Sequence, residues 1–172
     1  AWTSISWSSI DYLGNKKALH YKLSEIYAPI LLGLDIKGKD LYDVWVSNDL
    51  QRDIDGRVRI IVEDMEGNQM FAFSEKADVK ANSCYRLPNK VNINTLNKKK
   101  SECYARIIFM EEDTILSERI HFFTYPKDLE LIETEINPNI NFKDGKYYIE
   151  FTADVFVKDL YIEASERGDF SK

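Results

Sequence analysis

The chain has 172 residues, of which 44% are hydrophobic and 13% aromatic, so it can bury a core and is not an intrinsically disordered segment. Its net charge of −6 argues against nucleic acid and anionic membrane surfaces as main partners, and no apolar run is long enough to span a membrane. Cys84 and Cys103 fit no zinc-binding spacing, and they are either free thiols or a disulfide. We therefore predict no cofactor and no metal site. No signal peptide is visible at Ala1, and the compartment is left undetermined.

The first predicted element is a loop followed by one amphipathic helix. Ser8–Asp11 have the spacing of a capping box, and Asn15 is a second candidate cap. A helical pattern starts at Lys16, and Pro29 is expected to end it. The expected apolar face of the helix consists of Leu19, Leu23, Ile26 and Ile30. One such face must be buried against something.

After Pro29 the hydrophobic period changes to two, which predicts strands. The predicted strand segments are 29–38, 39–49, 57–65, 69–81, 90–96, 102–112 and 114–125. Their predicted inward residues are Tyr42, Val44, Val46, Val58, Ile60, Val62, Cys103, Ala105, Ile107 and Phe109. Turns are expected at Glu66–Asn68 and at Glu112–Asp113, and Lys98–Lys100 is interpreted as a solvated hairpin tip. This number and spacing of short strands is typical of an immunoglobulin-like sandwich.

Pro126 and Lys127 interrupt the pattern, and a second set of strands is expected from residue 128 onward. This set includes 128–136, a turn at Lys143–Gly145, and a strand in which Ile149, Phe151, Ala153 and Val155 point inward. These strands are too few to close a second core. The predicted fold class is mainly β: one α-helix, an immunoglobulin-like β-sandwich and a partial second β-sandwich. The predicted domain boundaries are 1–29, 30–124 and 125–172.

Residues 6–29, SWSSIDYLGNKKALHYKLSEIYAP, resemble the segment that follows the last barrel strand in β-mannosidases of glycoside hydrolase family 2. The matching positions are Ser6–Tyr12, Gly14, Lys17–Tyr21 and Ala28–Pro29. Two further stretches, 41–49 and 121–131, resemble the same proteins. The chain departs from the family at Asn15–Lys16, where the usual residues are Arg-Trp. This departure indicates either a changed packing neighbour, which we favour, or a variant subsite.

The resemblance implies that residues 1–29 are the loop and last helix of a (β/α)8 catalytic barrel. The intact enzyme would be a retaining exo-glycosidase that releases terminal β-linked mannose, in the periplasm, a secreted fluid or the lysosome. Its two catalytic glutamates would come from barrel strands earlier in the chain, and nothing in this sequence matches them. We therefore expect no catalytic residue here, and no hydrolysis by this chain alone. Its implied role is to support the barrel, which is its partner in cis, and the rim where a mannose-containing oligosaccharide binds.

Two tryptophans are the candidate substrate-binding residues. The resemblance places Trp2 and Trp7 near the C-terminal rim of the barrel, where they would line or support the −1 subsite; packing residues that anchor the loop are the alternative. Asp11 is expected to hold this loop by hydrogen bonds, while His20 and Tyr21 are expected to pack. A possible sugar-stacking platform consists of Tyr42, Trp45, Tyr85 and Tyr104, although burial in the core is the preferred interpretation.

Two other function classes remain open at this point. One is a carbohydrate-binding module with exposed aromatic side chains, and the other is a protein-interaction module with an exposed apolar patch. An apolar helix face without its barrel must lie on the β-domain, pair with a second copy in a dimer, or stay mobile.

Overall fold

The computed structural model describes residues 7–38, 41–88, 91–92, 98–160 and 162, and only the backbone of 36–38, 41 and 91. The chain begins with one helix, α1 (Ala18–Ile26). The strands that follow are β1 (Ile30–Gly38), β2 (Leu41–Asn48), β3 (Ile54–Asp64), β4 (Gln69–Val79), β5 (Ser83–Arg86), β6 (Val91–Asn92), β7 (Cys103–Glu111), β8 (Thr114–Phe122), β9 (Asn137–Lys143) and β10 (Lys146–Thr152). Two short 3-10 helices are η1 (Lys100–Glu102) and η2 (Pro126–Asp128).

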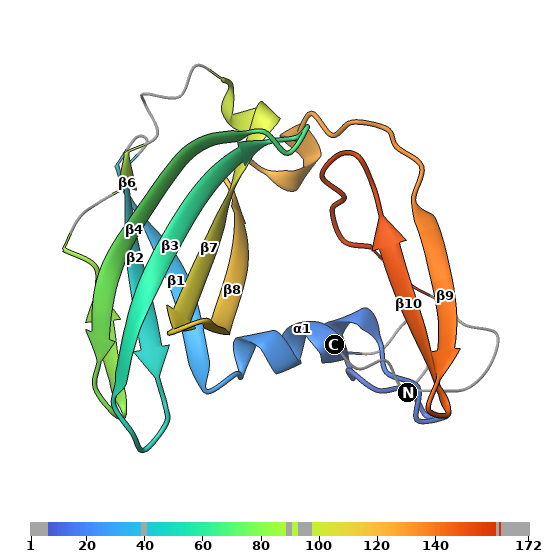
Figure 1. Cartoon of the computed structure of the whole chain (residues 1–172), viewed down its shortest axis with the longest axis horizontal. Coiled ribbons are helices and arrows are strands. Elements are labelled where there is room, and N and C mark those ends of the chain that lie inside the picture. Colours follow the sequence, from blue (N-terminus) through green and yellow to red (C-terminus); the bar gives the residue numbers. More distant parts are fainter. Residues whose placement is uncertain (1–6, 39–40, 89–90, 93–97, 161, 163–172) are drawn as a thin grey trace.

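Strands β1 to β8 form a sandwich of two antiparallel sheets (Figure 1). In the first sheet, β2 lies between β1 on one side and β5 and β6 on the other. The second sheet has the strand order β4-β3-β7-β8. Strands β9 and β10 pair with each other in a separate hairpin. The predicted fold class, mainly β with an immunoglobulin-like sandwich after one helix, is confirmed.

The core lies between the two sheets and is made by alternate residues of each strand. All ten residues predicted to point inward from β2, β3 and β7 are buried, and Phe109 is among the largest of them. The cluster is completed by Ile30 and Leu32 of β1, Ile54 of β3, Ala77 and Val79 of β4, and Leu87 and Phe123, which directly follow β5 and β8. The strict alternation in the sequence therefore predicts the packing well, because each strand has one face in the core and one face outside it.

One polar residue, Asn48 at the end of β2, is fully buried. Its Nδ2 donates to the carbonyl oxygens of Arg52 at 2.9 Å and Lys80 at 3.0 Å, and its Oδ1 accepts from the Leu50 N–H at 3.0 Å. These bonds satisfy the buried amide and join the β2–β3 connection to the end of β4. The sequence analysis did not single out Asn48, because a lone asparagine after a strand looks like an ordinary turn residue.

Two predictions concern the region between β4 and β7. The predicted strand at 90–96 is confirmed at Val91–Asn92, its other residues lie outside the described ranges, and β5 was not expected. The Lys98–Lys100 run is not a hairpin tip but leads into η1. There Lys98 lies 3.5 Å from the Asp64 carboxylate, and Lys99 lies 3.1 Å from that of Glu102. Ion pairing at the end of the sandwich thus accounts for these lysines.

The strand expected at 128–136 is also wrong. After η2 the described backbone runs without strand pairing until β9 begins at Asn137. Its hydrogen bonds go instead to η1, where the Glu130 N–H donates to the Ser101 carbonyl at 2.9 Å and Ser101 Oγ donates to Glu130 Oε1 at 2.8 Å. A pattern of alternating residues predicts a strand only where a partner strand lies alongside, and here none of the described strands does.

Strand β10 ends at Thr152, so the predicted inward strand face holds for the half-buried Ile149 and Phe151. Beyond the strand, Ala153 is exposed and Val155 is half-buried. The chain then returns to the sandwich. The Phe156 N–H donates to the Met65 carbonyl at 2.9 Å, and the ring centroids of Phe156 and Tyr104 are 4.1 Å apart. This contact covers part of the outer face of the second sheet, which explains why Tyr104 is buried although it points away from the core.

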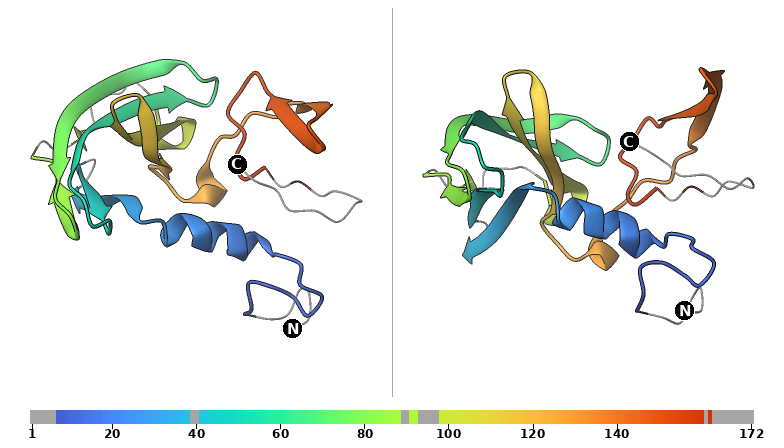
Figure 2. Two further views of the ribbon diagram at one scale, coloured as in Figure 1. Left: turned by 60° about the horizontal axis from the view of Figure 1, so that its bottom comes forward. Right: turned by 90° about the horizontal axis from the view of Figure 1, so that it is seen from below.

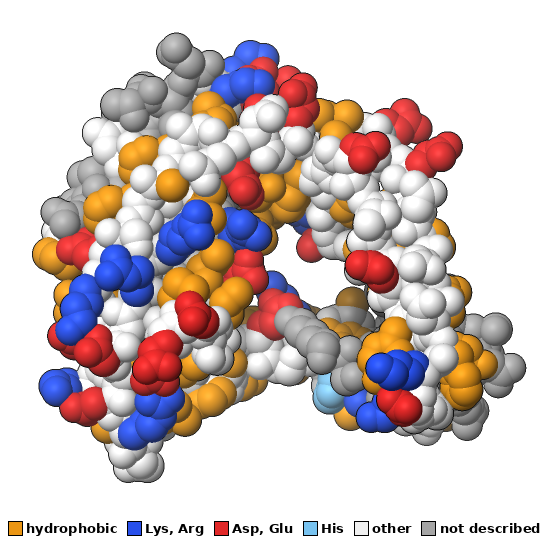
Figure 3. All heavy atoms as spheres, in the orientation of Figure 1, with side chains coloured by type: hydrophobic (Ala, Val, Ile, Leu, Met, Phe, Trp, Pro, Cys, Tyr) orange, Lys and Arg blue, Asp and Glu red, His pale blue; other side chains and the backbone are white. Residues whose placement is uncertain are grey.

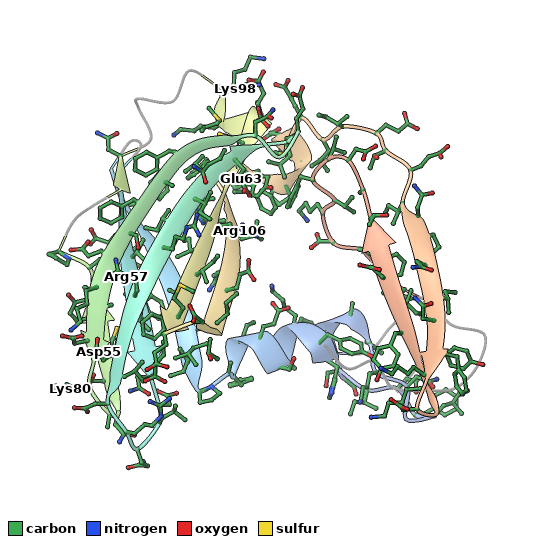
Figure 4. The ribbon with its side chains drawn as sticks, in the orientation of Figure 1. Asp55, Arg57, Glu63, Lys80, Lys98 and Arg106 are labelled. Carbon is green, nitrogen blue, oxygen red and sulfur yellow. The ribbon has the colours of Figure 1, made fainter. Side chains whose placement is uncertain are left out.

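Figures 1 and 2 show the sandwich on one side, the β9–β10 hairpin on the other, and α1 running from the sandwich toward the hairpin. The space-filling view has a hollow between these three parts (Figure 3). Along the second sheet, Arg57, Glu63 and Arg106 form a band of charge (Figure 4), in which Arg106 lies 3.9 Å from the Glu63 carboxylate. No helix in the described part of the chain is long and apolar enough to cross a membrane.

Candidate functional site

The candidate site begins with a short closed loop ahead of α1. Ile10 pairs with Lys16 in an isolated antiparallel bridge, and the Lys17 N–H donates to the Ser9 carbonyl at 3.0 Å. Between them the Asp11 N–H donates to the Asn15 carbonyl at 3.0 Å. We call residues 7–17 the Trp7 loop. Its backbone is held by its own hydrogen bonds, so its shape does not depend on contacts with the sandwich.

The Asp11 carboxylate holds the tip of the Trp7 loop. Its Oδ1 accepts from the N–H groups of Leu13 at 2.9 Å and Asn15 at 2.8 Å, and its Oδ2 accepts from Asn15 Nδ2 at 2.9 Å. Gly14 has a φ of +87°, a conformation that side chains with a Cβ rarely adopt. Burial of the carboxylate raises its pKa, but the hydrogen bonds from Asn15 and Leu13 outweigh it, so the pKa is lowered overall. The predicted structural role of Asp11 is confirmed.

The same turn occurs a second time, at Asp64–Asn68 between β3 and β4. Asp64 Oδ1 accepts from the N–H groups of Glu66 at 3.1 Å and Asn68 at 2.9 Å, and Asp64 Oδ2 accepts from Asn68 Nδ2 at 3.2 Å. Gly67 has a φ of +82°, close to that of Gly14. In both places the sequence is Asp-x-x-Gly-Asn. This turn therefore forms in two unrelated surroundings, which indicates that its own five residues determine it.

The Trp7 loop presents large side chains to solvent. Trp7 is 100% exposed and Tyr12 is 68% exposed. Packing of Trp7 against its own chain is therefore not observed. Trp2, the other candidate residue, lies outside the described residues, so its predicted role is untested.

Helix α1 continues the exposed surface. It buries none of its residues, and its predicted apolar face is open to solvent, with Leu19 46% and Ile26 48% exposed. Two predictions are corrected here. The N-cap is Lys17 without a side-chain hydrogen bond, so neither the Ser8–Asp11 box nor Asn15 caps the helix. Ile30 belongs to β1 and the sandwich core, because the chain leaves the helix after Ile26.

The four aromatic residues considered as a possible sugar-stacking platform do not share one exposed face. Tyr42 and Tyr104 are buried, and Tyr85 packs against the core cluster. Trp45 is half-buried on the outer face of the first sheet, which points away from the core. The preferred interpretation, burial in the core, is confirmed for Tyr42, and Trp45 is left as a separate feature.

Trp45 has a polar neighbourhood that the sequence analysis did not recognise. Its Nε1–H donates to Asp35 Oδ1 at 3.2 Å, and Arg86 donates to Asp35 Oδ2 at 2.9 Å. The Arg86 guanidinium also lies 3.8 Å from the Asp43 carboxylate. These residues come from β1, β2 and β5. Their proximity depends on the register of three strands, which the sequence alone does not give.

The carboxylates at the ends of the sandwich strands are held by cations. Lys80 lies 2.7 Å from Asp53, and Arg52 lies 2.7 Å from Glu111. The hydrogen bond from Lys80 lowers the pKa of Asp53, and that from Arg52 lowers the pKa of Glu111. A glycosidase acid requires the opposite, a raised pKa. Within the described ranges, no group of three or more His, Cys, Asp or Glu side chains is arranged to hold a metal ion, and Cys84 and Cys103 are free thiols.

Comparisons with known proteins agree with this geometry. The model of the mannosidase Ig/CBM-like domain family matches residues 40–128. β-Mannosidase A of Aspergillus oryzae is 25% identical over 166 residues, and β-mannosidase A of Aspergillus terreus is 24% identical over 169 residues. The matches cover 87% and 90% of this chain but only 18% of each relative. The chain thus spans less than a fifth of the length of the curated relatives that it matches.

Solved structures share the fold. The β-D-mannosidase of Dictyoglomus thermophilum superposes with a TM-score of 0.72 at 18% sequence identity, over 87% of this chain and 18% of that one. The exo-chitosanase of Amycolatopsis orientalis superposes with a TM-score of 0.61 at 11% identity, over 81% of this chain and 19% of that one. At these identities the superpositions establish the architecture of the chain and not its chemistry.

Proposed function

This chain belongs to the mannosidase Ig/CBM-like domain family, as its resemblance to glycoside hydrolase family 2 β-mannosidases indicated, and on that premise we propose that it is a non-catalytic supporting part of a β-mannosidase. In this proposal the sandwich is a scaffold, and the Trp7 loop and α1 form its contact with a catalytic barrel. The intact enzyme releases terminal β-linked mannose with retention of configuration.

The observation that carries the proposal is the contrast between the two parts of the chain. The sandwich closes its own core, in which Val44, Val58 and Phe109 are fully buried. The Trp7 loop, α1 and the C-cap of α1, in contrast, expose the large apolar side chains Trp7, Tyr12, Leu13, Leu19, Ile26 and Tyr27. So many exposed large apolar side chains in one short segment support a contact that the isolated chain lacks. A short helix with an open apolar face is stable chiefly when that face is packed.

Trp7 is proposed to stand at the rim of the active site. Its support is a combination of full exposure and a rigid base, since the hydrogen bonds of Asp11 fix the loop that carries it. An indole face presents a large apolar surface to the C–H groups of a sugar ring. Trp2 is assigned the same role by the resemblance alone.

The chain contributes neither of the two reacting carboxylates in this proposal. Retaining glycosidases need an acid and a nucleophile about 5 Å apart, and the acid needs a raised pKa. Asp53 and Glu111 are instead held ionised by Lys80 and Arg52. The chemistry is therefore assigned to the barrel, and this chain is assigned the support of the barrel and its rim.

The test is hydrolysis of an aryl β-mannoside by this chain alone and by a longer chain in which a β-mannosidase barrel precedes it. Activity only in the longer chain is expected. In that longer chain, Trp7→Ala should lower kcat/KM at least about tenfold, which corresponds to about 1.4 kcal/mol of lost transition-state stabilisation. Tyr125→Ala, which removes an aromatic side chain that is 74% exposed elsewhere, should leave kcat/KM unchanged. Activity of the short chain, or an inactive long chain that is folded, would refute the proposal.

A separate possibility is that α1 pairs with a second copy of the chain. It predicts that the isolated chain dimerises through Leu19 and Ile26 as its concentration rises, which light scattering measures directly. A monomer at all concentrations removes the dimer.

A further inference from the structure

A compact group of side chains on the outer face of the first sheet is separate from the Trp7 loop and α1. It consists of Gly33 and Asp35 on β1, Asp43 and Trp45 on β2, and Arg86 on β5. We call it the Trp45 patch. Gly33 lies directly across from Trp45 in the β1–β2 register, and Arg86 lies across from Trp45 on the other side.

The indole of Trp45 lies over Gly33. A Cβ on Gly33 would be 1.9 Å from both Cε2 and Cζ2 of Trp45, far closer than carbon atoms can approach. A Cβ in a strand points out of the sheet. The Trp45 ring therefore occupies the space above the sheet that a Cβ on residue 33 would fill. The sheet therefore supports one side of the indole, and Trp45 remains only half-buried. Among the described residues, no ring and no cation stacks on its other side.

The N–H edge of this indole borders a fixed polar rim. Asp35 accepts from Trp45 Nε1 with one oxygen and from Arg86 with the other. The Asp35 side chain is 39% exposed and that of Arg86 is 54% exposed, so both can be reached by a ligand. A guanidinium has five N–H donors, so Arg86 keeps donors for a ligand after it has paired with Asp35.

We propose that the Trp45 patch binds a neutral pyranose unit of a saccharide, which stacks on the indole and shares hydroxyl hydrogen bonds with Asp35 and Arg86. An apolar ring face beside paired donors and acceptors matches a sugar, which has C–H groups on one face and hydroxyl groups around its edge. The patch carries two carboxylates and one guanidinium, a net charge of −1, and this charge disfavours uronic or sulfated sugars.

This site is independent of the proposed barrel contact. It lies on the outer face of β1, β2 and β5, whereas the barrel contact is made by the loop and helix that precede β1. A single stacked ring with a few exposed hydrogen bonds gives weak binding, with a dissociation constant of roughly 1 mM. Such a site would keep a polymeric substrate near the enzyme and would take no part in hydrolysis.

The experiment is a titration of the folded 172-residue chain with β-1,4-linked mannotriose, followed through the tryptophan indole N–H signals in 15N NMR spectra. The signal of Trp45, assigned with Trp45→Phe, should shift and saturate below about 20 mM. Trigalacturonic acid, an anionic trisaccharide, should bind at least about fivefold more weakly. Arg86→Ala should weaken mannotriose binding at least about fivefold, because the guanidinium supplies the donors of the rim.

Arg52→Ala is the matched control, since Arg52 is also an exposed arginine paired with a carboxylate, that of Glu111. It should leave the affinity unchanged. The proposal fails if the Trp45 signal does not saturate, if another tryptophan responds in its place, or if Arg52→Ala weakens binding as much as Arg86→Ala. Line broadening of Trp45 with rising protein concentration, without sugar, would also overturn it, because the patch would then bind a second copy.

Discussion

Single aspartates shape both turns that have the sequence Asp-x-x-Gly-Asn. Asp11 and Asp64 accept the same three hydrogen bonds, and Gly14 and Gly67 take the same left-handed backbone conformation. The sequence analysis expected a turn near Gly67 but interpreted Ser8–Asp11 as a helix cap. The residues around Asp11 fit both a helix cap and an aspartate turn. In the sequence, only the second occurrence of Asp-x-x-Gly-Asn, at 64–68, favours the turn.

The first prediction concerns Asp64, whose carboxylate is buried at the end of the sandwich. Asp64→Ala leaves the N–H groups of Glu66 and Asn68 without their acceptor and should lower the free energy of unfolding by about 1–3 kcal/mol. The pKa of Asp64 is lowered, because its hydrogen bonds to Asn68 outweigh the effect of burial. Its stabilisation is therefore present above the ordinary aspartate pKa and is lost as pH falls through the lower folded value.

Chemical denaturation at pH 7 and pH 3 measures this effect. The difference between the original chain and Asp64→Ala should shrink at pH 3. Asp11→Ala is the matched control, because it disturbs the same turn outside the sandwich and should leave the unfolding of the sandwich unchanged. Equal destabilisation by both substitutions would contradict the separation of loop and sandwich.

His121 provides the second prediction. The centroid of its ring lies 5.4 Å from that of Tyr42 and 5.5 Å from that of Phe123, and its buried Nε2 has no hydrogen-bond partner among the described residues. Burial, together with the charge of Arg119, lowers the pKa of His121 to about 4. The unfolded chain binds a proton near pH 6.5 and the folded chain does not, so stability should fall from pH 6.5 to pH 4 by up to about 3 kcal/mol.

His121→Phe should remove this loss. The free energy of unfolding of the substituted chain, relative to that of the original chain, should therefore be higher at pH 4.5 than at pH 7.5. Thermal unfolding across that range is the measurement. His20→Phe places the same change in α1, which buries no residue, and should keep the original slope. An unchanged slope in His121→Phe would show that other groups cause the loss.

At the scale of elements, sequence periodicity predicted best where an element has one buried face. The strands β2, β3 and β7 follow the expected alternation, whereas 128–136 alternates without any described partner strand and is not a strand. Helix α1 was predicted, but its apolar face was extended to Ile30. The spacing of Ile26 and Ile30 fits a helix by coincidence, because Ile30 is the first core residue of β1.

The third prediction concerns the contact that joins the end of the described chain to the sandwich. Phe156→Ala removes the ring that covers Tyr104. It should lower the free energy needed to detach this segment from the sandwich by about 1–2 kcal/mol, as expected for a half-buried aromatic side chain. Limited proteolysis should then cut segment 129–136 faster. Phe142→Ala, which removes a ring that is 65% exposed on β9, should have little effect. Equal cleavage rates in the two variants would rule out the role of Phe156.

At the scale of the whole molecule, the sandwich buries a core between its sheets while its two flanks leave apolar side chains exposed. Helix α1 and the β9–β10 hairpin both expose large apolar side chains, including Leu19, Ile26, Ile140, Phe142 and Tyr147. The sequence predicted the class of fold and the open character of both flanks. It could not place Trp45 beside Arg86 or Phe156 on Tyr104, because those contacts depend on strand register and on the path of the chain after β10.

The measurement that tests the central claim most directly is amide hydrogen exchange of α1, in the 172-residue chain and in a longer chain with a β-mannosidase barrel. We predict that the amides of α1 exchange quickly in the short chain and at least about a hundredfold more slowly in the longer one, because the apolar face of α1 is then covered. The amides of β3 and β7, which lie in the closed core, should be protected equally in both. Equal exchange of α1 in the two chains would contradict this proposal, because it would show that the barrel does not cover the apolar face of α1.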